Sequence, residues 1–214
     1  MALQIRPVTA NDASFLAEVM LMATRSHLSR GPWDLVINGS DEVCLAYLKC
    51  LAVTKMWSWC HYSSFIVAEV DKRPVSALCS YDPARNGMPS LMQAMQEVSS
   101  GLGQSQGALE AALERLEPFM TCVPEQPEGM WIIENVATVP EFRRQGLCNA
   151  LLEAILEKGR QEGYQQSQIA VFIGNTPAIR AYEKVGFKVA DEKRTPEFEA
   201  VIHAPGIVRL LRSL

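Results

Sequence analysis

The sequence predicts an α/β fold in which helices flank a central sheet. A β-rich hairpin between residues 64 and 81 and a strand, loop, helix, strand unit between residues 130 and 173 predict the sheet, and two amphipathic patterns before residue 52 predict helices. At 214 residues with 48% hydrophobic content, the chain can bury one sizeable core, and its length does not require a second domain. We therefore expect a single domain spanning residues 1–214.

The chain is predicted to open with a short strand at Leu3–Arg6, followed by a helix. Thr9 and Asp12 have the spacing of a capping box, and the apolar residues that follow recur at helical spacing. A loop is expected after Arg30–Trp33. A second helix is predicted to begin at Ser40, and its apolar face comprises Cys44, Tyr47, Leu48 and Leu51.

The hairpin is predicted to consist of strands at Ser64–Val70 and Val75–Tyr81, with the polar segment Asp71–Pro74 between them. The pattern then changes to two amphipathic helices that are separated by Gly, Ser and Pro, so residues 82–129 are predicted to be a helical insertion between the third and fourth strands. The remaining predicted elements are strand Met130–Val139, helix Gly146–Arg160, strand Ser167–Ile173, helix Thr176–Lys184 and strands at 187–190 and 207–211.

Composition excludes several classes of protein. Twenty Lys and Arg against 24 Asp and Glu are scattered along the chain, which argues against nucleic acid as a partner. No stretch approaches the roughly 18 to 20 apolar residues of a membrane span, and the N-terminus lacks the pattern of a signal peptide. We expect a cytoplasmic protein that does not bind membranes.

The six cysteines form no CxxC pair and no cluster with the histidines at metal-binding spacing. Cys44, Cys50 and Cys79 lie in apolar stretches, which is typical of buried thiols. We expect reduced structural thiols and no metal site.

The segment Phe142–Asn149 joins a predicted strand to the start of a helix, where unpaired backbone N–H groups and the helix dipole favour an anion. Gly146 allows the backbone to approach phosphate oxygens, and Arg143 or Arg144 adds charge-assisted hydrogen bonds. The segment matches neither a P-loop nor a GxGxxG turn, because it contains a single glycine. An ordinary turn with solvated arginines remains the alternative for this loop taken alone.

Two segments together resemble a known family. Glu134–Leu152 resembles the fourth strand, loop and third helix of the GNAT superfamily of N-acetyltransferases, whose R/Q-x-x-G-x-G/A signature falls on Arg143, Gly146 and Cys148. Asn175–Phe187 resembles the second hallmark of that superfamily, N-x-x-A-x-x-x-Y-E-K-x-G-F. The resemblance covers residues 134–187, and it implies a GNAT fold with a mixed, mostly antiparallel twisted sheet.

The resemblance also implies acetyl-coenzyme A as the cofactor. Its pantetheine arm is expected to pair with the backbone of the strand, and its diphosphate is expected to bind the loop and helix start. The cofactor-binding residues implied are Val136, Ala137, Thr138, Arg143, Arg144, Gln145, Gly146, Leu147, Cys148, Asn149 and Asn175. Cys148 departs from the family pattern, which has Gly or Ala at this position.

The activity implied is direct transfer of the acetyl group to a primary amine. Tyr182 matches the family's usual proton donor, and Glu134 matches the position of a catalytic or water-holding glutamate. The alternatives are that Tyr182 is only a packed aromatic ring and that Glu134 is only a partly solvated carboxylate on the strand. A further alternative makes Cys148 an acyl-carrying nucleophile, because thiol pKa values fall at helix N-termini.

The acceptor, a small-molecule amine or a peptide amine, cannot be identified from residues 26–63 and 82–129, which match no template. The aromatic run Trp57–Tyr62 suits either an acceptor pocket or the edge of the core, and His27, His61 and His203 are assigned no role. Two other functions remain open. These are a non-catalytic coenzyme A-binding regulatory module, and an interaction protein that uses the methionines of the insertion. Monomer and homodimer are both expected states.

Overall fold

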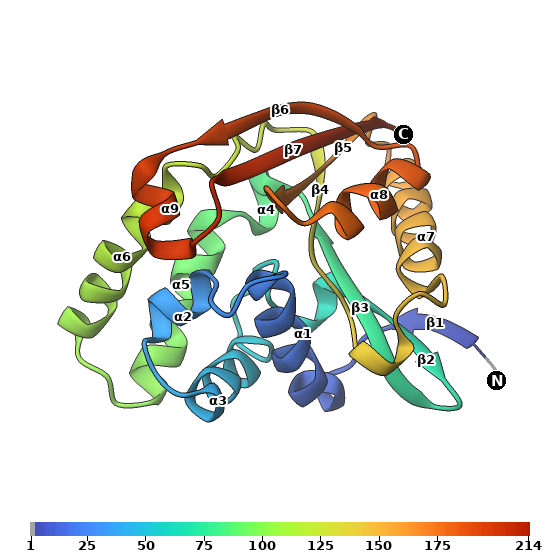
Figure 1. Cartoon of the computed structure of the whole chain (residues 1–214). Helices are drawn as coiled ribbons and strands as arrows, with labels where there is room; N and C mark the ends of the chain where they lie inside the picture. The colour runs from blue at the N-terminus through green and yellow to red at the C-terminus, as the bar shows by residue number, and fades with distance from the viewer. Residues whose placement is uncertain (1–2) are drawn as a thin grey trace.

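The protein contains a seven-stranded mixed sheet with strand order β1-β2-β3-β4-β5-β7-β6 (Figure 1). The computed structural model describes residues 3–214, and for Gln106 only the backbone. Neighbouring strands are antiparallel except β4 and β5, which are parallel. The strands are β1 (Leu3–Pro7), β2 (Phe65–Val70), β3 (Arg73–Tyr81), β4 (Met130–Thr138), β5 (Gln166–Phe172), β6 (Lys188–Arg194) and β7 (Gly206–Ser213). The predicted α/β class and mixed, mostly antiparallel sheet are confirmed.

Helices cover both faces of the sheet. The α-helices are α1 (Ala13–Arg25), α2 (Pro32–Ile37), α3 (Asp41–Leu51), α4 (Pro83–Asn86), α5 (Met88–Gly101), α6 (Gln106–Met120), α7 (Leu147–Gln161), α8 (Thr176–Lys184) and α9 (Pro196–Ile202). The 3-10 turns are η1 (Ala10–Asp12), η2 (Tyr62–Ser64) and η3 (Pro140–Phe142). In Figure 1, α7 and α8 lie on one side of the sheet, and α1, α2, α3, α5 and α6 lie on the other.

Side chains alternate along the strands, so neighbouring residues of one strand pack into cores on opposite faces of the sheet. Ala77 and Cys79 of β3 pack into the core beneath α1, α3 and α5. Leu78, between them, packs with Ile133 into the core beneath α7 and α8. Among residues 3–214, no helix is long and apolar enough to cross a membrane.

The β2–β3 hairpin turns over two residues. Asp71 and Lys72 have φ values of 50° and 68°, and positive φ at both central positions is the property of a tight turn that matches strand twist. Strand β3 therefore begins at Arg73, two residues before the predicted start, and the predicted four-residue connector at Asp71–Pro74 is wrong.

Beyond Ile133, strands β4 and β5 separate. Their pairing ends at Ile133↔Ile169, although β5 continues to Phe172 with β7 as its partner. On the other side of β4, the register to β3 shifts beside Asn135, whose φ of 54° marks an extra residue in β4. This bulge bends the second half of β4 away from β5 and opens the sheet at its centre.

Three further local predictions differ from the structure. The predicted loop after Arg30–Trp33 overlaps α2, which Asp34 caps by accepting a hydrogen bond from the Gly31 N–H at 2.8 Å. Helix α9 lies between β6 and β7, where no helix was predicted, and Thr195 Oγ1 caps it by accepting from Phe198 N at 3.2 Å. Cys50, predicted to be buried, is exposed because it lies on the outer face of α3. All six cysteines are free thiols.

Candidate active site

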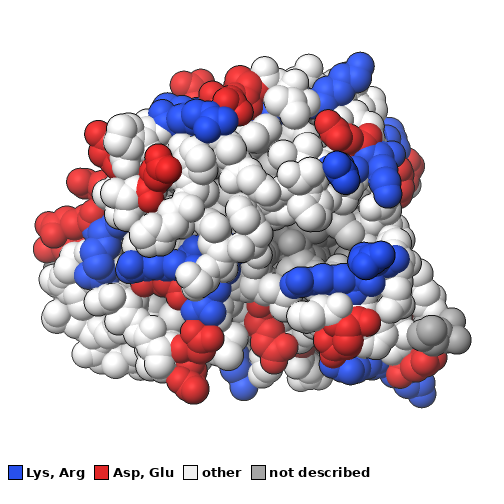
Figure 2. Space-filling model, in the orientation of Figure 1, with Lys and Arg blue, Asp and Glu red and all other residues white. Residues whose placement is uncertain are grey.

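A cavity of about 1340 Å³ lies where β4 and β5 separate, between the two layers of helices. Figure 2 shows this side of the molecule hollowed, with basic side chains on part of the rim. Of the residues predicted for the site, those that line the cavity are Glu134, Val136, Ala137, Thr138, Arg143, Arg144, Gly146, Leu147, Cys148, Asn149, Asn175 and Tyr182. Gln145 does not line it, because its Nε2 turns back and donates to the Glu141 carbonyl oxygen at 3.4 Å.

The N-terminus of α7 faces the cavity without a side-chain cap. Its first hydrogen bond runs from Ala150 N to Gly146 O at 3.0 Å, so the N–H groups of the three preceding residues have no partner within the helix. Gly146 has a φ of 82°, and a Cβ added there would meet no atom within 4 Å. The open space in front of these N–H groups and the positive end of the helix dipole fit a phosphate group.

Basic side chains gather at this end of the cavity, which we call the α7 end. Arg143, Arg144, Arg180 and Lys184 all line it, and none of the four forms an ion pair within residues 3–214. Arg143 Nε donates to the Thr138 carbonyl oxygen at 3.0 Å, which holds the guanidinium beside the end of β4. These cations complement the anion site at the helix terminus.

The second half of β4 exposes one edge of its backbone to the cavity. Residues 134–138 lie beyond the last pair with β5, so this edge has no strand beside it in the described sheet. Val136, Ala137 and Thr138 all line the cavity. An unpaired strand edge binds an extended amide-containing ligand through main-chain hydrogen bonds.

Glu134 lies at the floor of the cavity, opposite Cys79 in β3. Burial raises the pKa of its carboxyl to about 7. No hydrogen bond or ion pair to this carboxylate occurs among the described residues, so nothing offsets the burial. A group with this pKa both accepts and releases a proton near neutral pH.

Tyr182 belongs to helix α8 and lines the same cavity as Glu134. Its ring packs edge-on against Phe187 with centroids 6.4 Å apart. Burial, with smaller contributions from Cys148 and Glu134, raises the pKa of the Tyr182 hydroxyl well above its ordinary value. The hydroxyl therefore keeps its proton at neutral pH and is available as a donor.

Cys148 lines the cavity in the first turn of α7. Burial raises the pKa of its thiol to about 11. This shift is opposite to the lowered pKa that an acyl-carrying nucleophile requires. The burial of this thiol therefore gives the Cys148 alternative no support.

Asn175 belongs to a chain of hydrogen bonds at the end of β5. Its Oδ1 accepts from Ala178 N at 3.2 Å and caps α8, and its Nδ2 donates to Ser26 Oγ at 2.6 Å. Ser26 Oγ in turn lies 3.3 Å from His27 Nδ1. Both ends of the amide are therefore engaged in joining α8 to the segment after α1.

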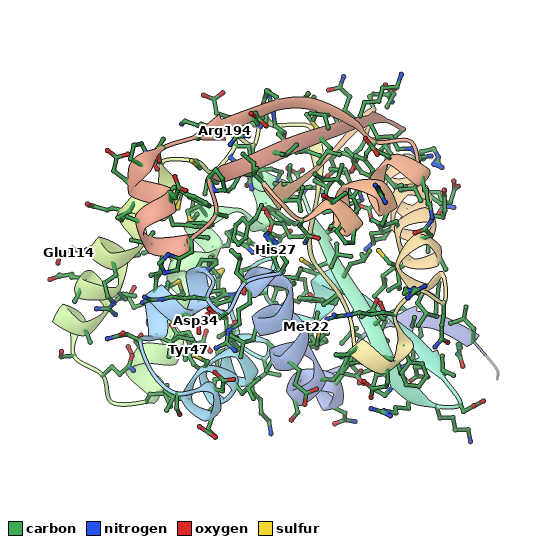
Figure 3. The ribbon with its side chains drawn as sticks, viewed as in Figure 1. Met22, His27, Asp34, Tyr47, Glu114 and Arg194 are labelled. Atoms are coloured by element: carbon green, nitrogen blue, oxygen red, sulfur yellow. The ribbon has the colours of Figure 1, made fainter. Side chains whose placement is uncertain are left out.

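His27 lines the cavity, although it was assigned no role from the sequence. It lies at the centre of the molecule in Figure 3, and a Cβ added to Gly174 would come within 3.0 Å of its Nε2. Its neighbour Ser26 contacts a residue 149 positions away, and only the fold creates this proximity. No local pattern signals such a contact.

The opposite end of the cavity, which we call the α6 end, is lined by side chains of α2, α5, α6 and Trp59. Trp59 stacks on Tyr81 with centroids 5.0 Å apart, whereas Trp57 is exposed and stacks on His61. The predicted aromatic cluster therefore contributes one ring to the cavity. The methionines at positions 88, 92 and 95 also line this end.

Comparisons with known proteins agree with this architecture. The model of the acetyltransferase (GNAT) family matches residues 42–187, more than half of the chain. The ribosomal protein bS18-alanine N-acetyltransferase of Escherichia coli K12 is 37% identical over 60 residues, which cover 28% of this chain and 40% of that protein. The N-alpha-acetyltransferase of Saccharolobus solfataricus P2 is 38% identical over 58 residues, which cover 26% of this chain and 34% of that protein.

The fold itself is shared over nearly the whole chain. An N-acetyltransferase from Staphylococcus aureus Mu50 superimposes with a TM-score of 0.71 at 19% identity, covering 98% of this chain and all of that chain. The PaiA N-acetyltransferase of Thermoplasma acidophilum was solved in complex with coenzyme A. It superimposes with a TM-score of 0.51 at 12% identity, and the alignment covers all of both chains. The chain matches about two fifths of the length of its Escherichia coli relative. On the family match and this architecture, the chain belongs to the acetyltransferase (GNAT) family.

Proposed function

We propose that this chain transfers an acetyl group from acetyl-coenzyme A to a primary amine by direct attack. One observation carries the proposal. A carboxyl with a pKa of about 7 and a tyrosine that keeps its proton line one cavity, together with the uncapped N-terminus of α7. The coenzyme A complex of the Thermoplasma acidophilum protein and the N-acetyltransferase names of the relatives support the same activity.

The residues that would hold the cofactor are those of the α7 end. The N–H groups of residues 147–149 and the cations of Arg143 and Arg144 suit the diphosphate, and the free edge of β4 suits the pantetheine amides. Asn175 is better assigned to positioning α8, because both ends of its amide are already engaged. Acetyl-coenzyme A, when bound, supplies an activated acetyl group as a thioester.

Glu134 acts as the base. An alkyl ammonium has a pKa near 10.4, so the acceptor arrives protonated at neutral pH and must lose a proton before it attacks. The Glu134 carboxylate, directly or through a water molecule, takes that proton, and its raised pKa makes it a stronger base than an exposed glutamate.

Tyr182 acts as the acid. Its hydroxyl donates the proton that the departing thiolate needs, and its raised pKa keeps the hydroxyl protonated until that moment. Glu134 lies on strand β4 and Tyr182 on helix α8, and in this proposal the reaction takes place between these two side chains. Proton removal and proton delivery thus occur on two sides of one reaction centre.

A non-catalytic coenzyme A-binding module is the competing function, and one experiment separates the two. Purified protein is incubated with acetyl-coenzyme A and a panel of amines and peptides, with free thiol and product mass as readouts. We expect thiol release that requires an amine and yields an acetylated amine. Coenzyme A binding without any acetylated product would support the module instead. We further propose a single cytoplasmic domain, and solution scattering distinguishes monomer from homodimer.

A further inference from the structure

The two ends of the cavity differ in charge. Every Lys and Arg that lines the cavity within the described part of the chain belongs to the loop before α7 or to α8. The charged side chain that lines the α6 end is Glu117, and Glu134 lies at the floor between the two ends. An acceptor that carries a carboxylate would find no cation there to pair with, and an unpaired buried charge is strongly unfavourable.

The wall of the α6 end is apolar and partly open. Met88 is 39% exposed and Met120 is 38% exposed, although both line the cavity. Met92, Leu113 and Trp33 continue the same wall. Apolar surface that the fold leaves accessible inside a concave site favours an apolar ligand, and methionine side chains adapt to ligands of differing shape.

The floor of this end offers hydrogen-bond acceptors. Gln168 of β5 is 2% exposed and lines the cavity, and its Oε1 has no hydrogen-bond partner, while its Nε2 donates to the Glu125 carbonyl oxygen at 3.1 Å. Gln168 pairs with Ile132, the residue that precedes Glu134 on the same face of β4. A buried unpaired acceptor beside a carboxylate suits a group that donates several N–H bonds.

The volume leaves room for such a molecule beside the cofactor. Pockets for one drug-sized ligand span roughly 300–1,000 Å³. The present cavity, at about 1340 Å³, exceeds that range and runs continuously from α7 to α6. The α6 end is therefore available while the α7 end is occupied.

We infer that the acceptor is a primary monoamine with an apolar alkyl or arylalkyl body, whose nitrogen lies between Glu134 and Gln168 and whose body lies against the α5 and α6 wall. The inference rests on the proposed function and specifies its second substrate. It excludes free amino acids and amino-carboxylates as good acceptors.

The test compares n-butylamine, n-hexylamine and n-octylamine with 8-aminooctanoate, using thiol release for rates and titration calorimetry with coenzyme A present for binding. Burial of one methylene is worth about 0.8 kcal/mol, so kcat/KM should rise about fourfold for each added methylene. The aminooctanoate should react on the order of a hundredfold more slowly than octylamine, because its carboxylate lacks a partner.

Variants locate the effect. Met92→Arg supplies the missing cation, so it should raise kcat/KM for 8-aminooctanoate at least about tenfold and lower it for octylamine. Met92→Gln should flatten the chain-length dependence, whereas Met56→Gln, a half-buried methionine outside the cavity lining, should leave it unchanged. Gln168→Leu should raise the KM for octylamine about tenfold, with Gln166→Leu at the exposed start of β5 as the matched control.

The outcomes separate this inference from the proposed function. A flat chain-length series, or equal rates with 8-aminooctanoate or a peptide N-terminus, would overturn the inference while acetyl transfer stands. Absence of product with every amine would overturn the proposed function. In that case octylamine binding that Met92→Arg abolishes would still support the apolar amine site, and absence of octylamine binding would overturn it as well.

Discussion

The two ends of the cavity are built in different ways. The α7 end consists mainly of main-chain groups, namely the N–H groups of residues 147–149 and the free edge of residues 134–138. The α6 end consists of side chains from α2, α5, α6 and Trp59, which are far apart in the sequence. A local motif of main-chain groups suits a ligand that stays the same across a family. Side chains that come from distant parts of the sequence can be replaced one at a time, which changes the second substrate.

Mutations at the centre and at each end of the cavity should therefore have distinct consequences. Changes at the centre should affect catalysis, changes at the α7 end should affect coenzyme A affinity, and changes at the α6 end should affect only the choice of amine.

The largest effect is expected at the centre, from Tyr182→Phe. Loss of the hydroxyl removes the proton donor, and general acid catalysis typically contributes about 10²–10⁴-fold, so kcat should fall at least about a hundredfold. Coenzyme A affinity, measured by calorimetry, should stay within about twofold. Tyr164→Phe is the control, because Tyr164 bonds Asp82 outside the cavity. A Tyr182→Phe enzyme with normal turnover would remove this residue from the acid role.

At the α7 end, Gly146→Ala should lower coenzyme A affinity about tenfold. The added methyl group enters the open space in front of the unpaired N–H groups and interferes with a charge-assisted hydrogen bond. Gly163→Ala is a matched control, since Gly163 also has a positive φ and no atom near an added Cβ, but it follows the other end of α7. Both variants should lose roughly 1 kcal/mol of stability. If Gly146→Ala and Gly163→Ala bound coenzyme A with equal affinity, the diphosphate would have to bind elsewhere.

The pH dependence of kcat/KM tests Glu134. With its pKa at about 7, the carboxylate is protonated below that value, so kcat/KM should rise about tenfold per pH unit up to about 7 and then level off. Tyr182 stays protonated in this range, so no fall should follow near neutral pH. Stopped assays with an alkylamine from pH 5 to 9 measure the profile. If kcat/KM kept rising between pH 7 and pH 9, the amine would have to enter already neutral, without help from Glu134.

The smallest expected effect is on stability. Because burial raises the folded-state pKa of Glu134 from 4.5 to about 7, the unfolded state releases its proton first, and stability falls as pH rises between these values. Glu134→Gln should therefore stabilise the protein by roughly 1–3 kcal/mol at pH 8 and have little effect at pH 4.5. Asp12→Asn should destabilise the protein at pH 8, because Arg6 lowers the pKa of Asp12 to about 2 and the folded state therefore favours the ionised carboxylate. Urea unfolding at the two pH values measures both changes.

Local sequence signals predicted the α7 end well. Helix α8 has the predicted bounds Thr176–Lys184, and α7 begins one residue after the predicted start at Gly146. These elements have a capping residue, a proline in the first turn or a strong apolar periodicity. The assignment of the individual cofactor-binding residues there remains a prediction.

Other features depend on the fold. The bulge at Asn135 opens the cavity, yet Asn135 lies inside an unbroken strand pattern. His27 and Gln168 reach the cavity because distant elements meet there. Helices α2 and α9 were missed because six or seven residues provide too little periodicity to distinguish a helix from a loop. Their caps at Asp34 and Thr195 were the available signals.

Amide hydrogen exchange with and without coenzyme A tests whether the α7 end binds the cofactor, because it reports on main-chain groups and requires no acceptor. We expect slower exchange at residues 134–138 and 147–149 in the complex, while exchange at α5 and α6 remains unchanged until an alkylamine is added. Slower exchange at α5 and α6 with coenzyme A alone, and none at the start of α7, would contradict the assignment of the two ends.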